Sequence, residues 1–106
     1  MIIITLKENA WQAKLAATKL GYKSAAIVFG KTIYLCNVSK FSFLNNKTWL
    51  RHEVAHVKQY EQIGFVKFLL LYLVESIKHG YERNRFEVEA RALEKDDQIL
   101  VGVDFV

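Results

Sequence analysis

The hydrophobic pattern changes near residue 46, and this change constrains the fold more than any other feature of the chain. Before residue 46, short β-branched and apolar runs are separated by glycine and polar residues, a pattern typical of strands. After residue 46, apolar residues recur at the three- and four-residue spacing of helices over much longer stretches. The chain has 106 residues, enough for one hydrophobic core. We therefore expect one α+β domain over residues 1–106, with a small sheet followed by helices.

The first part of the chain predicts a strand, a helix and a hairpin. Strands are expected at residues 2–5, 25–29 and 32–36, and a helix is expected at residues 8–20. The two later strands are separated only by Gly30 and Lys31. A glycine at the first position of a two-residue loop suits a type II′ turn. Together these elements predict a small, largely antiparallel sheet.

The second part of the chain predicts long helices and a short extended tail. Helices are expected at residues 47–62, 65–79 and 85–98, and residues 99–106 return to strand-like alternation. The middle helix is apolar on nearly every side, so we expect it to be buried, with a dimer contact or a membrane-surface contact as the alternatives. Its longest apolar run is far shorter than the roughly 20 residues that span a bilayer. We expect no transmembrane segment, and either a monomer or a homodimer.

Composition excludes several classes of protein. Hydrophobic residues make up 52% of the chain, which excludes a disordered segment. The net charge is +4, but the lysines are spread over several predicted elements without a binding motif, so we expect no nucleic-acid binding. Cys36 is the single cysteine, so no internal disulfide can form. The N-terminus lacks the basic lead and cleavage site of a signal peptide, and we expect a cytoplasmic protein.

The strongest chemical signal is the sequence His-Glu-Val-Ala-His at residues 52–56, inside a predicted helix. On a helix, His52 and His56 lie one turn apart on the same face, so two imidazoles can converge on one metal ion. Glu53 lies about 100° around the helix, close enough to act on a water molecule beside that metal. The alternative without a metal site is a pair of surface histidines on an ordinary helix. Zinc is the expected metal, although two imidazoles and a carboxylate also suit cobalt or nickel.

A catalytic zinc site needs a third protein ligand. A third histidine six residues after His56 would indicate one class of metalloprotease, but Gln62 stands at that position, which excludes this class. The spacing alone leaves several downstream candidates open. They are Glu75, His79, Glu82, Glu87 and Glu89.

Residues 52–60, followed after an apolar helix by residues 80–90, resemble the gluzincin metallopeptidases, especially the small soluble minigluzincins. The resemblance implies a zincin-like fold similar to the catalytic core of membrane-embedded CAAX-processing and heat-shock metalloproteases. In this family a glutamate that opens a Glu-x-x-Ala segment is the third zinc ligand, and that position is Glu87 here. The chain departs from its relatives at Arg85, where many have proline, and at Arg91, where many have aspartate. The carboxylate that orients a zinc-bound histidine is therefore expected to come from elsewhere.

Two alternatives remain for the third ligand. Asn84 and Glu87 also form an N-capping pattern, in which the glutamate would reach back to the backbone N–H of the cap. Glu89 is the reserve ligand, because helical geometry turns it some 200° away from Glu87 and only one of the two can face the metal.

His79 and Tyr81 lie between the two predicted zinc-binding helices, where a donor could stabilise the oxyanion that forms at a peptide carbonyl. We treat both as candidate catalytic residues. Each has a structural alternative. His79 would suit the C-terminal end of a helix, and Tyr81 would suit a half-buried position.

The sequence thus predicts a zinc metallopeptidase in which His52, His56 and Glu87 hold zinc and Glu53 is the general base. A peptide substrate would lie along an edge strand, for which the strand at 32–36 is the candidate. The apolar tail, residues 99–106, could occupy the cleft and make the enzyme latent, or it could simply add a strand. The competing hypothesis is a catalytically silent metal-binding or protein-interaction module of the same fold.

Overall fold

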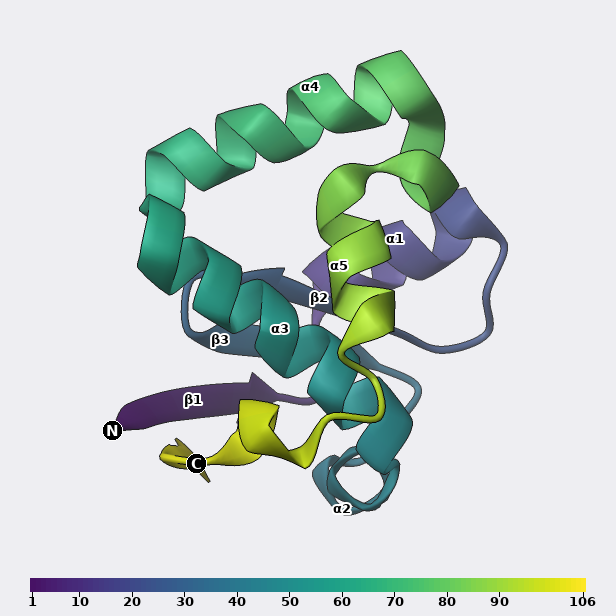
Figure 1. Ribbon diagram of the computed structural model, residues 1–106. Coiled ribbons are helices and arrows are strands. Elements are labelled where there is room, and N and C mark those ends of the chain that lie inside the picture. The colour runs from purple at the N-terminus through teal and green to yellow at the C-terminus, as the bar shows by residue number, and fades with distance from the viewer.

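A computed structural model describes all residues, 1–106, as an α+β fold in which helices surround a small sheet (Figure 1). The strands are β1 (Ile2–Lys7), β2 (Ala25–Phe29), β3 (Thr32–Cys36) and β4 (Val103–Phe105). The helices are α1 (Trp11–Leu20), α2 (Lys40–Asn45), α3 (Lys47–Ile63), α4 (Phe65–Arg83), α5 (Arg85–Ala92) and the short 3₁₀ helix η1 (Asp97–Leu100). The predicted change from strands to helices is confirmed, and the predicted return to a strand in the tail is confirmed by β4.

The sheet is mixed, so the prediction of a largely antiparallel sheet is wrong. Its strand order is β2-β3-β1-β4, and β1 is parallel to both β3 and β4. Helix α1 leads from β1 into β2, which runs opposite to β1, and the hairpin then reverses the chain, so that β3 runs in the same direction as β1. Only β2 and β3 are antiparallel, joined by the predicted two-residue loop, in which Gly30 has the positive φ of 63° that a type II′ turn requires.

The strand order also shows that the strand predicted to bind the substrate is not an edge strand. Because β3 lies between β2 and β1, residues 32–36 are inside the sheet and have no free edge. The exposed edge next to the hairpin belongs to β2. The other edge belongs to β4, formed by the tail, which pairs with β1 on the side of the sheet away from β2.

Polar caps explain where the helices begin. Ser39 accepts a hydrogen bond from the N–H of Ser42 at the start of α2, a helix that the sequence did not predict. Asn46 accepts one from the N–H of Trp49 and starts α3 close to the expected residue. Asn84 does the same for Phe86 at the start of α5. Sequential caps of this kind let the chain turn sharply between helices without proline.

Two helix ends differ from the prediction. Helix α4 continues past residue 79 to Arg83, but Gly80 interrupts it with non-helical angles, φ 77° and ψ 171°. Helix α5 ends at Ala92 rather than near residue 98. Asp96 then caps the separate helix η1 by accepting a hydrogen bond from the N–H of Gln98. The acidic segment between α5 and η1 is therefore a turn.

The two faces of the sheet carry different helices. Alternate residues of β2 and β3 pack either with α3 or with α1, as the two-residue period of a strand requires. On one face, Leu50, Val54 and Val57 of α3 are completely or almost completely buried against the sheet. On the other face, Ala13 and Ala17 let α1 lie close to the strands. This packing fixes the orientation of α3, whose opposite face carries the histidines.

Helix α4 is mostly exposed, so the expectation that it would be buried is wrong. Phe68 is its only buried residue, and it packs between the rings of Tyr60 and Phe86. In Figure 1, α4 lies at the periphery, on the side of α3 away from the sheet. No helix of the protein has the length and apolar character needed to cross a membrane.

Helix α2 provides a matched test of core packing. Phe43 is fully buried and its ring contacts the ring of Trp49 edge-on, whereas Phe41 on the same helix is 79% exposed. We predict that Phe43→Ala lowers the free energy of unfolding by about 3–5 kcal/mol, because it leaves a cavity. Phe41→Ala should change it by less than about 0.5 kcal/mol. Urea denaturation measures both, and equal losses would contradict this packing.

Candidate metal centre

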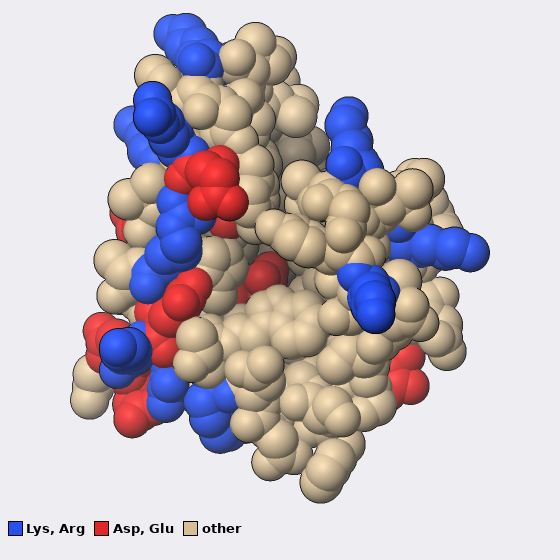
Figure 2. Space-filling view, turned by 90° about the vertical axis from the view of Figure 1, so that its right-hand side faces the viewer, with Lys and Arg blue, Asp and Glu red and all other residues tan.

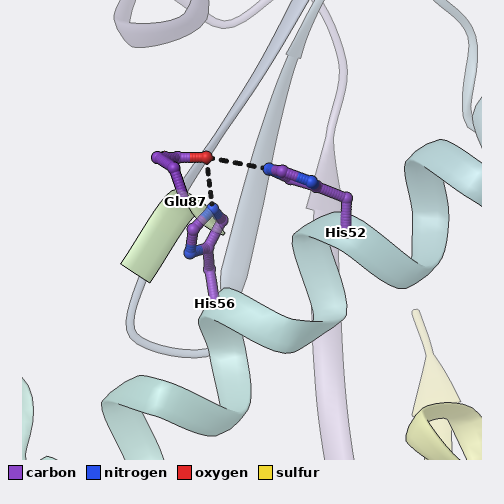
Figure 3. A group of neighbouring side chains, drawn as sticks. All are labelled: His52, His56 and Glu87. Carbon is purple, nitrogen blue, oxygen red and sulfur yellow. Dashed lines mark hydrogen bonds and ion pairs between the residues drawn. The ribbon is translucent and has the colours of Figure 1, made fainter. Parts of the chain in front are cut away.

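Two histidines and one glutamate form a buried cluster between α3 and α5. His52 and His56 project from the face of α3 opposite the sheet, with their ring centroids 5.0 Å apart. Glu87, on the first turn of α5, approaches them from the other side (Figure 3). Its Oε1 atom lies 2.9 Å from Nε2 of His52 and 3.2 Å from Nε2 of His56. One potential ligand atom of each residue lies within 4.8 Å of the others.

The position of Glu87 decides between the sequence alternatives. Asn84 caps α5 with its own side chain, and its backbone N–H donates to the carbonyl of Tyr81, so the capping role predicted for Glu87 is not used. Glu89 faces Gln59 and accepts a hydrogen bond from its Nε2 atom at 2.9 Å. Glu87, and not Glu89, therefore lies with the two histidines.

The Nδ1 atom of each histidine makes a hydrogen bond to a second side chain. His52 Nδ1 lies 2.8 Å from Oε2 of Glu94, and His56 Nδ1 lies 2.8 Å from Oε1 of Gln59. With a proton on each Nδ1, both rings direct Nε2 at the same point. A hydrogen bond of this kind fixes ring orientation and raises the basicity of a metal ligand.

Glu94 was missed by the sequence analysis, although it supplies the carboxylate that the position of Arg91 lacks. It lies beyond the end of α5, in the turn before η1, where Arg51 Nη1 donates to its carbonyl oxygen at 3.1 Å. Arg91 instead donates to the carbonyl of Glu82. Nothing in the local pattern distinguishes Glu94 from the other acidic residues of this segment.

Tyr72 is a second residue that the sequence analysis missed. Its hydroxyl donates a hydrogen bond to Oε2 of Glu87, the oxygen that the histidines do not contact. Burial, together with the charge of Glu87, raises the pKa of Tyr72 well above its usual range, so the hydroxyl stays a donor. Tyr72 thus holds one oxygen of Glu87 and leaves the other turned to the histidines.

The metal-free cluster binds protons strongly. Burial lowers the pKa of His52, but the hydrogen bond to Glu87 and the charge of Glu53 outweigh burial and raise this pKa to about 9. The same balance raises the pKa of His56. For Glu87, burial raises the pKa, but the hydrogen bonds to His52 and His56 outweigh it and hold the pKa far below its usual range. The carboxylate of Glu87 and the two imidazoles therefore stabilise one another in their charged forms.

This donor set fits a metal ion. Two imidazoles and one carboxylate are a common ligand set for zinc in catalytic sites, which leaves one position for water or substrate. Nε2 of each histidine faces Glu87 and is the atom that would bind a metal, while Nδ1 is hydrogen-bonded to Glu94 in His52 and to Gln59 in His56. The structure supports a site for a metal ion and does not by itself specify which metal.

Two cavities meet beside the cluster. The larger, of about 1200 Å³, is mostly apolar and lies between α1, β2 and α4, and all five residues of β2 line it. The smaller, of about 380 Å³, is mostly polar. Figure 2 shows the hollow as a tan surface with a small acidic area inside it. The tail lines neither cavity, which favours its role as a strand over the predicted latency.

The predicted catalytic residues differ in where they lie. Glu53 lines both cavities. Burial raises the pKa of Glu53 to about 7, although the charges of His56 and His52 oppose this. Tyr81 also lines both cavities, and burial raises its pKa above the usual range. His79 is exposed on α4 and lines neither cavity, so the structure brings Tyr81 to the cluster and leaves His79 outside it.

Comparisons with protein-family models, with curated proteins and with solved structures found no match to the chain. The gluzincin resemblance therefore rests on the motifs at residues 52–60 and 80–90 and stays a prediction.

The hydrogen bond between Glu94 and His52 gives a test of the site. We predict that Glu94→Ala weakens zinc binding about 10–100-fold, because the ring of His52 loses the carboxylate that orients it. Competition with a chromophoric chelator measures the affinity. The matched control is Glu61→Ala, since Glu61 pairs with Lys31 on the surface and should leave zinc affinity unchanged. Equal zinc affinity in the two variants would contradict the role of Glu94.

Proposed function

We propose that the protein is a zinc-dependent peptidase. One observation carries the proposal: a buried cluster of His52, His56 and Glu87 lies where an apolar cavity and a polar cavity meet, with the carboxylate of Glu53 facing both. This arrangement combines a metal-ligand set, a base and a substrate cleft. A buried but closed metal site would need neither the base nor the cleft.

The residues have distinct roles in this proposal. His52, His56 and Glu87 would hold zinc, which when bound polarises a carbonyl group and lowers the pKa of a water molecule. Glu53 takes the proton from the attacking water and gives it to the leaving amine. A pKa of about 7 suits such a group, because it can bind and release a proton near neutral pH. Tyr81 keeps its proton and can donate a hydrogen bond to the carbonyl oxygen of the substrate.

The free edge of β2 would align an extended peptide substrate in the cleft. An extended peptide can pair with the backbone groups of an edge strand, and side chains of the peptide would alternate between the two sides of the cleft. Trp11 and Leu15 of α1 and Leu73 of α4 form apolar walls beside β2. We therefore place the peptide along residues 25–29 instead of the strand at 32–36.

Glu53→Gln tests the proposal. The substitution keeps size and removes the base, so we predict that hydrolysis of a fluorescence-quenched peptide library by the zinc-loaded protein falls at least about a hundredfold. Zinc content should stay the same, because Glu53 is not part of the ligand set. Glu61→Gln is the control for the loss of one carboxylate and should leave both quantities unchanged.

The outcomes separate the two functional hypotheses. Cleavage by the parent that persists in Glu53→Gln would mean a contaminating enzyme or a different base. Stoichiometric zinc without any cleavage by the parent would favour the silent metal-binding module. Absence of zinc binding would remove both of these hypotheses and leave the protein-interaction module.

A further inference from the structure

Helix α4 exposes a continuous apolar stripe that the peptidase site does not use. Its members recur at intervals of three and four residues, so they share one face of the helix. They are Val66 (68% exposed), Leu70 (58%), Leu73 (50%), Val74 (45%) and Ile77 (85%). The opposite side of the same helix carries Phe68, which is buried, and Tyr72, which reaches Glu87. We call these five residues the α4 stripe.

The α4 stripe is a large apolar patch for a solvent-exposed protein surface. Single exposed aliphatic residues are ordinary, but five on one helix face form a contiguous patch of the kind that marks an interaction site. Leu73 belongs both to the stripe and to the wall of the apolar cavity, where Trp11 and Leu15 of α1 lie opposite and are also exposed. The apolar surface therefore continues from the outside of α4 to the mouth of the cleft.

The charges beside the stripe are positive. Lys67 lies near its first turn and Lys78 near its last, and both are exposed. Helical geometry puts both lysines next to Val74, on the same border of the stripe. Glu75 lies on the far side of the helix and accepts a hydrogen bond from the backbone N–H of Arg85. The stripe thus has a basic border and no acidic residue on its own face.

The shape and charge of the stripe favour an anionic bilayer over a second copy of the chain. Figure 1 shows α4 along the periphery of the molecule, and the five residues of its stripe are 45–85% exposed. In an antiparallel symmetric pair packed stripe to stripe, Lys67 of one copy would lie near Lys78 of the other, and like charges would oppose association. A bilayer interface accepts a convex apolar helix face and attracts the lysines that border it.

We propose that α4 docks the protein on an anionic lipid surface. The helix lies in the plane of the interface, with the α4 stripe among the acyl chains and with Lys67 and Lys78 at the headgroups. The apolar cleft mouth, which shares Leu73 with the stripe, then lies next to the membrane. The docking needs no metal ion, so it can be tested independently of the proposed peptidase activity.

Vesicle sedimentation tests the proposal on the full chain. We predict that the protein sediments with vesicles of phosphatidylcholine and phosphatidylglycerol, and much less with phosphatidylcholine alone, and that added salt reduces binding. Leu70→Gln combined with Ile77→Gln should reduce the partition coefficient at least about tenfold, because both side chains would enter the acyl region. Lys67→Gln combined with Lys78→Gln should reduce the preference for anionic vesicles.

A matched pair of single substitutions controls for general loss of apolar surface. Val66 in the stripe is 68% exposed, and Val101 near the C-terminus is 65% exposed. Val66→Gln should weaken vesicle binding and Val101→Gln should not, while circular dichroism should show unchanged melting for both. Failure to sediment with anionic vesicles would overturn the proposal, as would binding that the double stripe variant leaves intact. A dimer in light scattering that the stripe variant converts to monomer would assign the stripe to a second copy instead.

Discussion

The contact between Glu87 and two imidazoles is the interaction on which the rest of the structure depends. A buried carboxylate is costly unless charge and hydrogen bonds compensate it, and here both histidines contact the same oxygen while Tyr72 donates to the other. This contact joins α5 to α3. Gln59 reinforces it, because the same side chain meets His56 and donates to the carbonyl of Phe86 on α5.

The parts of the site that depend on local geometry could be predicted from the sequence. His52 and His56 follow from helical spacing. Glu87 was predicted from the family resemblance, and its side chain lies with the histidines and does not cap α5. Glu94 and Tyr72 could not be predicted, since a turn beyond one helix and a packed face of another bring them to the cluster. Tyr81 reaches the cavities and His79 does not.

The fold shows the same division between local and distant determinants. The hairpin around Gly30 and the start of α3 at Asn46 depend on turn and cap chemistry, and both were predicted. The direction of β1 relative to β3 depends on how α1 and the hairpin are placed beside β1, which a strand pattern does not encode. Helix α4 was expected to be buried because of its composition. Composition shows that a surface is apolar, but neighbouring elements decide whether it is covered, and on α4 they bury only Phe68 completely or almost completely.

The central claim is that these three side chains form a metal site, and metal content tests it most directly. Elemental mass spectrometry should find close to one zinc per chain in the native protein and in Glu89→Ala, and almost none in Glu87→Ala. The two variants change the same helix by the same substitution, but only Glu87 lies with the histidines. A native protein that holds no metal after zinc is supplied, or a Glu87→Ala variant that retains it, would contradict the account.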